Sequence, residues 1–160
     1  MACRRCDDAR MTDEIASWRA VAERLAPERS YWLSTVTADG APHAAPVWGV
    51  IVADVWWFYT ERVTVKARNL ATDRRVVMHL ADGEDVVIVH GHVEDIGHPS
   101  TRPDVVDAFG AKYSRPGDRP FLPLADPAFD VLYALRPSRA MLWQLDDYEG
   151  TQRRWRSSGN

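Results

Sequence analysis

The clearest indication of the fold comes from residues 31–59, YWLSTVTADGAPHAAPVWGVIVADVWWFY. This stretch contains three β-rich runs, at 31–37, 42–52 and 55–59, which are separated by two short turn sequences. Short apolar and aromatic runs bounded by turn residues are typical of antiparallel strands joined by hairpins. Pro46 has no N–H to donate to a sheet ladder, so the second run is expected at a sheet edge or at a bulge.

The rest of the chain adds more strands than helices. Helices are predicted from the apolar spacing and the capping residues at 12–25, at 64–71 and from about 100 to 113. Further strands are predicted at 75–80, 86–95, 129–136 and 139–145, and the proline-rich segment 114–127 is expected to be a loop. The continuous apolar run that opens 86–95 predicts burial on both faces of that strand. The fold class is therefore α+β and β-dominated, a small antiparallel barrel with helices at its rim.

Length and composition restrict the classes of protein to which the chain can belong. Its 160 residues fit one domain, and a formal net charge of -3 gives no overall field for nucleic acid or an anionic membrane. No apolar run approaches the roughly 20 residues of a membrane span, and no signal peptide is recognisable, so a cytoplasmic protein is expected. Cys3 and Cys6 lie in a charged leader, without the further ligands that a zinc site needs. Residues 1–10 are predicted to be disordered, and residues 11–160 to form a single domain.

The segment 59–70, YTERVTVKARNL, indicates a bound anion. A helix that starts near Thr64 has the positive end of its dipole there, yet basic residues surround that end: Arg62, Lys66 and Arg68. A phosphate bound to the free N–H groups and to these side chains makes the arrangement favourable. The alternative is that the long side chains extend into water, where screening makes their repulsion small.

Aromatic residues offer a wall for a planar ligand. Four tryptophans lie on predicted strands: Trp48, Trp56, Trp57 and Trp143. Such residues either stack on a heterocycle or pack in the core. His90 and His92 share a strand face, but no third ligand is identifiable, so no metal site is predicted.

Several motifs occur in a characteristic order: WLSTV at 32–36, the turn Asp39–Gly40, PHAAPVW at 42–48, WFYT at 57–60, KARNLA at 66–71 and GHVE at 91–94. Together they resemble the pyridoxamine 5'-phosphate oxidase-like superfamily, and within it the flavin and deazaflavin oxidoreductases of actinobacteria. The match covers about residues 30–95, and residues 136–143 fit the closing strands of the family more loosely. The resemblance implies a split β-barrel of six to seven antiparallel strands, in agreement with the barrel expected from the strand pattern.

The resemblance also implies a cofactor and the residues that hold it. Similar proteins are usually homodimers with FMN or the deazaflavin coenzyme F420 at the subunit interface. By this resemblance the ring is lined by His43, Pro46, Val47, Trp48, Tyr59 and Thr60. The phosphate is held by Thr64, Lys66, Arg68 and Asn69, and the partner's cofactor is reached by Trp143 and Arg153.

Departures from the family pattern bear on the activity. The oxidases that make pyridoxal phosphate carry an arginine and a lysine where this chain has His43 and Trp48. They also carry a second basic residue where this chain has Val65. These differences argue against the formation of pyridoxal phosphate by this protein. The Pro-Val-Trp strand and K-x-R-N-L favour an F420-dependent oxidoreductase that transfers hydride to a small planar electrophilic substrate. The alternatives are an FMN-dependent oxidase or flavin reductase, and a non-catalytic binder of flavin, haem or another tetrapyrrole. No residue is assigned as a general acid.

Overall fold

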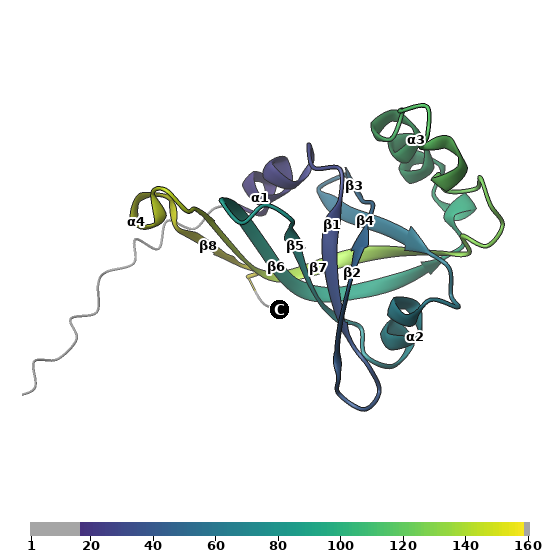
Figure 1. The fold of residues 1–160 in the computed structure, drawn as a ribbon, viewed down its shortest axis with the longest axis horizontal. Coiled ribbons are helices and arrows are strands. Elements are labelled where there is room, and N and C mark those ends of the chain that lie inside the picture. Colours follow the sequence, from purple (N-terminus) through teal and green to yellow (C-terminus); the bar gives the residue numbers. More distant parts are fainter. Residues whose placement is uncertain (1–16, 159–160) are drawn as a thin grey trace, which may run out of the picture.

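A computed structural model describes residues 17–158 (Figure 1). Its elements, in chain order, are α1 (Trp18–Leu25), β1 (Tyr31–Val36), β2 (Pro42–Val47), β3 (Val50–Val52), β4 (Val55–Thr60), α2 (Val65–Thr72), β5 (Arg75–Leu80), β6 (Asp85–Gly97), the 3-10 turn η1 (Pro99–Thr101), α3 (Pro103–Lys112), the 3-10 turn η2 (Arg119–Phe121), β7 (Val131–Gln144), α4 (Tyr148–Thr151) and β8 (Arg153–Arg156). The leader 1–10, with Cys3 and Cys6, lies outside the described residues.

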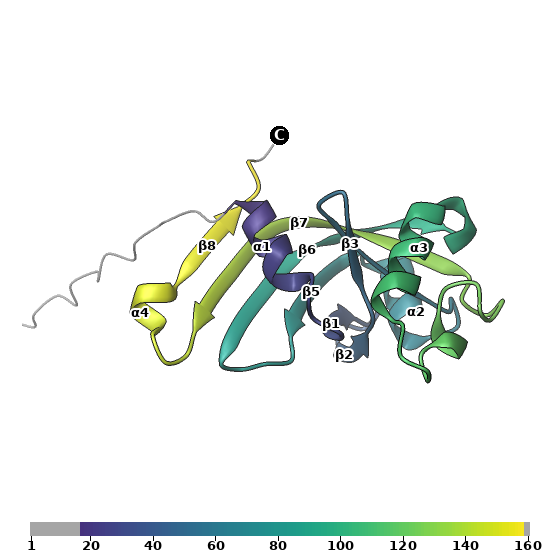
Figure 2. The same ribbon diagram turned by 90° about the horizontal axis from the view of Figure 1, so that it is seen from above.

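One antiparallel sheet organises these elements, in the strand order β2-β1-β5-β6-β7-β4-β3, with β8 beside β7. The two strands at the ends of this order, β2 and β3, follow each other in the chain with only Trp48 and Gly49 between them. The sheet therefore has to curl until its two edges approach each other, as Figures 1 and 2 show. The result is a split barrel that is not closed by hydrogen bonds, and the predicted fold class is confirmed. Pro46 lies on the edge strand β2, as expected.

The break between β2 and β3 corrects the prediction of one strand over 42–52. Gly49 passes directly against Trp56, and a Cβ at this position would overlap the indole ring. A glycine is therefore needed where the chain crosses from one edge of the barrel to the other. The next turn, at Ala53 and Asp54, has both residues in the left-handed region, with φ of 51° and 58°, which is the backbone that tight hairpins favour.

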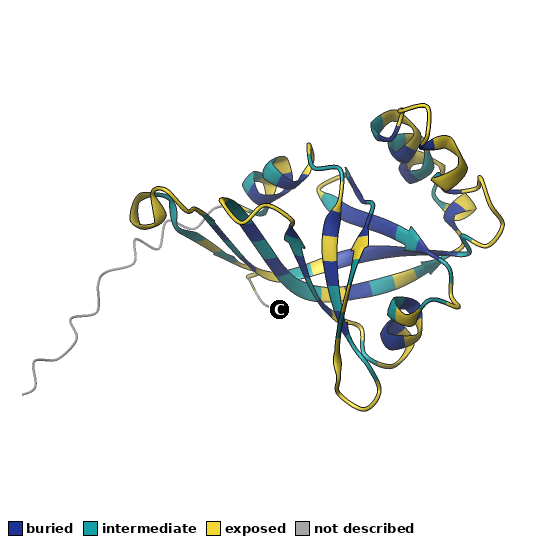
Figure 3. Ribbon diagram, in the orientation of Figure 1, coloured by how far each residue is buried: buried dark blue, intermediate teal, exposed yellow. Residues whose placement is uncertain are grey.

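Strand alternation places the core inside the barrel (Figure 3). On β1, Tyr31 and Leu33 are fully buried, whereas Trp32 between them is 38% exposed. Trp56 is buried in the same core cluster as Tyr31. Trp57 faces the opposite way, into a second cluster that α3 covers. Trp56 and Trp57 are therefore core residues and do not form a ligand wall.

Four segments differ from their sequence predictions. Helix α1 begins at Trp18, because Ser17 is extended and caps it by accepting a hydrogen bond from the Ala20 N–H at 3.2 Å; the predicted start at Thr12 lies outside the described residues. The two strands expected over 129–145 are one strand, β7, with a register shift opposite β6. The polar tail contains α4 and β8, which were not predicted. The start of β6 is buried on one face only, since Val86 and Ile88 are half-buried.

No helix within residues 17–158 is long and apolar enough to cross a membrane.

Candidate functional site

A cavity of about 440 Å³ opens where β2, the end of β4 and the start of α2 meet. Seven of the predicted site residues line it: Pro46, Val47, Trp48, Tyr59, Thr60, Thr64 and Lys66. Three further residues complete the lining and were not predicted: Glu61, Phe121 and Phe129. The structure thus brings together the predicted ring-binding segment and the predicted phosphate-binding helix.

The polar end of the cavity is built by the turn between β4 and α2. Thr64 has an extended backbone and caps α2, because its Oγ1 accepts a hydrogen bond from the Ala67 N–H at 3.4 Å. The same hydroxyl donates to the Glu61 carbonyl oxygen at 2.8 Å. Within residues 17–158, the backbone N–H groups of Val65 and Lys66 have no hydrogen-bond partner. These free donors and the helix dipole favour an anion at this end.

Lys66 supplies the positive charge of the cavity. Its side chain is half-buried, and burial lowers the pKa of its ammonium group, although attraction by Glu61 opposes this shift. Lys66 forms no ion pair within residues 17–158. A desolvated cation that lacks a partner gains most from an incoming anion.

The other two basic residues predicted here are engaged elsewhere. The Arg62 guanidinium pairs with both carboxylate oxygens of Asp95, at 2.8 and 3.2 Å. Arg68 donates to the Val63 carbonyl oxygen at 2.8 Å and lines a separate hollow on the other side of α2. Of the three basic side chains, Lys66 is therefore the one that lines this cavity among the described residues.

Trp48 forms a rigid apolar wall of the cavity. Its indole stacks on the Tyr113 ring with a centroid distance of 4.2 Å and an interplanar angle of 5°, and the Arg29 guanidinium lies 5.0 Å from the indole centroid. The Tyr113 hydroxyl accepts from the Gly49 N–H at 2.8 Å and donates to the Arg29 carbonyl oxygen at 2.7 Å. Lys112 donates to the Gly49 carbonyl oxygen at 2.8 Å. The position of Trp48 is thus fixed by Lys112 and Tyr113 at the C-terminal end of α3, which the sequence alone does not connect with the site.

The loop between α3 and β7 covers one side of the cavity. The Tyr59 hydroxyl donates to the Phe121 carbonyl oxygen, and the Phe121 ring meets the Trp48 ring edge-on at 6.3 Å. Phe129 packs edge-on against Tyr59 at 5.3 Å. Burial raises the pKa of Tyr59. Tyr59 therefore keeps its proton and anchors the loop.

Two predicted residues lie near the cavity but serve the fold. Asn69 is buried, and its side-chain amide donates to Thr35 Oγ1 at 2.9 Å, which ties α2 to β1. His43 Nδ1 is 3.3 Å from the same hydroxyl. Neither side chain is among those that line the cavity.

Trp143 and Arg153 lie at the ends of β7 and β8 that flank α4 in the chain, and α4 is at the opposite end of the molecule from α2 (Figures 1 and 2). Trp143 packs edge-on against Tyr148 at 5.9 Å, and Arg153 donates to the Gly150 and Gln152 carbonyl oxygens, each at 2.9 Å. Neither residue contributes to the cavity of its own chain. Over the described ranges, no group of three or more His, Cys, Asp or Glu side chains is placed to hold a metal.

Comparison with known proteins adds a family and a set of related folds. The sequence profile described as pyridoxamine 5'-phosphate oxidase matches residues 17–141. A solved F420 reductase is 27% identical, with a TM-score of 0.59, and the match covers 74% of this chain and 94% of that one. No curated protein matches the sequence.

Two further solved structures share the fold at lower identity. An FMN-binding protein of Nostoc punctiforme, related to pyridoxamine 5'-phosphate oxidase, is 18% identical with a TM-score of 0.57, over 88% of this chain and 90% of that one. A heme storage protein of Vibrio cholerae is 16% identical with a TM-score of 0.59, over 75% of this chain and 87% of that one. These two likenesses bear on the fold alone.

Proposed function

Because the chain belongs to the pyridoxamine 5'-phosphate oxidase family, we propose that it is an oxidoreductase that binds the deazaflavin coenzyme F420 and transfers hydride to a small planar electrophilic substrate. The observation that carries the proposal is the cavity in which Trp48, Tyr59 and Lys66 lie together. One end offers a cation and free backbone donors for a phosphate, and the other offers aromatic surface for a planar ring. The 27% identity to an F420 reductase supports the choice of cofactor.

The residues present fit such a group. Lys66, the Thr64 hydroxyl and the N–H groups at the start of α2 would hold the phosphate, and Pro46, Val47 and Trp48 would lie along the ring. Glu61 also lines the cavity and offsets part of the Lys66 charge. A haem is less well matched, because no histidine, cysteine or methionine is among the lining residues of the described cavity to serve as an axial ligand.

When bound, the reduced deazaflavin supplies a hydride from C5 of its ring. The protein itself binds and orients the cofactor and the acceptor, and it excludes water from the site. Trp48, fixed by its stack on Tyr113, shields one side of the site, and the loop that carries Phe121 covers another. Tyr59 holds its proton on the Phe121 carbonyl oxygen and is not a proton donor to substrate. We assign no side chain as the general acid, and the proposal takes the proton that completes the reduction from solvent.

The cavity is open on one side in a single chain, and neither Trp143 nor Arg153 of the same chain is among its lining residues. We therefore include in the proposal a homodimer in which Trp143 and Arg153 of the second copy reach the cofactor. The acceptor is bound in the remaining space beside Phe121 and Phe129, whose rings favour a planar, apolar molecule.

The proposal is tested by titrating the purified, cofactor-free protein with F420 and, in parallel, with FMN, while cofactor fluorescence is followed. Tighter binding of F420 supports the proposed enzyme, and the reduced coenzyme is then assayed for oxidation by planar electrophilic acceptors. Preferential binding of FMN would instead indicate an FMN-dependent oxidase or flavin reductase. Tight binding without turnover of any acceptor would indicate a non-catalytic carrier, and binding of neither would refute the cofactor site.

A further inference from the structure

Glu61 is the one acidic side chain among the described residues that line the cavity. The backbone holds this residue in place from both sides. The Glu61 carbonyl oxygen accepts hydrogen bonds from the Thr64 N–H at 3.1 Å and from the Thr64 hydroxyl at 2.8 Å. The next residue, Arg62, donates its backbone N–H to the Asp130 carboxylate at 2.8 Å. The turn that leads into α2 therefore places a carboxylate beside the polar end of the cavity, where a phosphate is expected.

The carboxylate of Glu61 determines how much positive charge this end of the cavity offers. The titratable side chains of its described lining are Tyr59, Glu61 and Lys66, and burial keeps Tyr59 protonated by raising its pKa. Glu61 attracts the Lys66 ammonium group, yet neither forms an ion pair within residues 17–158. Their formal charges cancel. What remains is the field of the free N–H groups at the start of α2, equivalent to about half a positive charge.

A second cation is missing from the described lining of the cavity. Asp95 holds the Arg62 guanidinium with both carboxylate oxygens, and Arg68 donates to the Val63 carbonyl oxygen. A phosphate with one negative charge gains the attraction of Lys66 and of the N–H donors. A second negative charge on the same phosphate would lie near the Glu61 carboxylate without a cation of its own. Like charges that share a site favour protonation of one of them.

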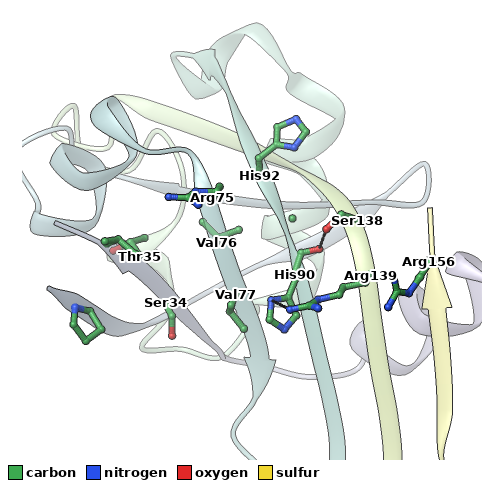
Figure 4. A pocket seen from close by; sticks show the side chains of 13 residues that line it. Ser34, Thr35, Arg75, Val76, Val77, His90, His92, Ser138, Arg139 and Arg156 are labelled. Atoms are coloured by element: carbon green, nitrogen blue, oxygen red, sulfur yellow. Dashed lines mark hydrogen bonds between the residues drawn. The ribbon is translucent and has the colours of Figure 1, made fainter. Parts of the chain in front are cut away.

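Another hollow of the chain has the opposite composition. It has a volume of about 760 Å³ and lies among β1, β5, β6, β7 and β8 (Figure 4). An Arg139 guanidinium nitrogen lies 3.3 Å from His90 Nδ1 there, and neither Arg139 nor Arg156 forms an ion pair with a described residue. Its described lining contains no Asp or Glu. Charge alone favours a dianion in this hollow, so binding there has to be distinguished from binding beside Glu61.

We propose that Glu61 is a specificity-determining residue, which limits the polar end of the cavity to a phosphate with a single negative charge. A phosphodiester carries one charge and binds as it is. A phosphate monoester has a second pKa of about 6, so at neutral pH most of it is a dianion that binds only after it has taken up a proton. F420 contains a phosphodiester and FMN contains a monoester. The inference therefore rests on the proposed function and gives a physical reason for a preference for F420 over FMN.

The test compares a monoester with a diester on the same ring. The probes are FMN and its methyl phosphodiester, and the corresponding 5'-phosphate of the deazaflavin ring and its methyl phosphodiester. Fluorescence titrations between pH 6 and pH 8 give the dissociation constants. Ionisation of the ring or of Lys66 affects both members of a pair, so the ratio of the monoester constant to the diester constant isolates the phosphate. In the wild type this ratio should rise about 50-fold from pH 6 to pH 8, because a phosphate with a pKa of about 6 is half protonated at the first pH and about 1% protonated at the second.

Four variants assign the effect to its residue. Glu61→Gln should reduce the rise to less than about fivefold, mainly by strengthening monoester binding at pH 8. Glu61→Asp keeps the carboxylate and should retain most of the rise. Asp107→Asn removes the same charge from an exposed position of α3 outside the cavity and should behave as the wild type does. Arg139→Gln should leave the ratios unchanged, and a changed ratio in this variant would assign the monoester to the basic hollow and overturn the inference.

The outcomes separate this inference from the proposed function. A wild-type ratio that is independent of pH would refute the inference and leave the cofactor site in place, because another cation would then match the second charge. A rise that persists in Glu61→Gln would refute the role of Glu61, and diester binding by that variant shows that it is folded. Since each ratio is taken on one ring, stronger binding of the flavin pair would refute the choice of F420 without touching the inference. Binding of neither pair would refute the cofactor site and, with it, the inference.

Discussion

Replacing Lys66 by methionine should weaken cofactor binding by about 10- to 30-fold. Lys66 is the only basic side chain among the described residues that line the cavity, and it is half-buried. A hydrogen bond to a charged group contributes about 1.5–3 kcal/mol, and each 1.4 kcal/mol is a factor of ten in affinity. Glu61 is close enough to attract the ammonium group, so we expect the lower part of this range, about 1.5–2 kcal/mol.

The measurement is a fluorescence titration of wild type, Lys66→Met and Arg68→Met with F420 and with FMN. Methionine keeps most of the apolar stem of either side chain and removes only the charged head. Arg68 is two positions away but is bonded to the Val63 carbonyl oxygen outside the cavity, so Arg68→Met should change the affinity by less than about twofold. Since both cofactors carry a phosphate, the Lys66 effect should be similar for the two.

The dependence of binding on ionic strength tests the same contact between Lys66 and the cofactor phosphate. Raising the ionic strength should weaken binding to the wild type more than binding to Lys66→Met, because the variant has lost the screened charge. Equal affinities of wild type and Lys66→Met, with both proteins folded by circular dichroism, would refute the assignment of the phosphate to the start of α2. An equal loss in Arg68→Met would show that the field of the helix end, and not a contact with Lys66, determines the affinity.

Two other predictions concern stability. Burial lowers the pKa of Lys112 from 10.5 to about 8. Between these pH values the unfolded chain binds more protons than the folded chain, so Lys112 makes the free energy of unfolding rise with pH. Lys112→Met should remove at most about 3 kcal/mol of that rise, measured by urea unfolding across this pH range. An unchanged pH slope in the variant would contradict the buried ammonium group. Asn69→Ala removes the buried bond to Thr35 Oγ1 and should lower the free energy of unfolding by about 1–3 kcal/mol while changing cofactor affinity by less than about threefold. A large loss of affinity with unchanged stability would restore Asn69 to the cofactor site.

Much of the fold could be predicted because the residues that specify its strands and turns lie close together in the sequence. Turn residues and alternating apolar positions marked β1, β2 and β4 within one stretch of chain, and Pro46 marked an edge. The predictions failed where tertiary contacts decide. The break at Gly49 depends on the Trp56 ring lying against it, and the two strands expected over 129–145 join into β7 because β6 provides a continuous partner with a register shift. Val86 and Ile88 belong to an apolar run that predicted burial on both faces of β6, yet both are only half-buried, because an apolar residue on a strand does not by itself show which face packs in the core.

The two ends of the candidate site also differ in whether the local sequence could predict them. Thr60, Thr64 and Lys66 are neighbours in the sequence, so a strand end followed by a helix cap was enough to place them together. The aromatic end depends on contacts between distant segments: Gly49 and Tyr113, 64 positions apart, share the hydrogen bond that holds Trp48 in place. Charges misled the prediction for a related reason, since nothing in the local sequence showed that Asp95, 33 positions from Arg62, would take that guanidinium away from the cavity. A basic run therefore predicts an anion site only as far as its members are free of ion pairs in the folded chain. Within residues 17–158, Arg62 is paired with Asp95, whereas Lys66 forms no ion pair and its charge is only partly offset by Glu61.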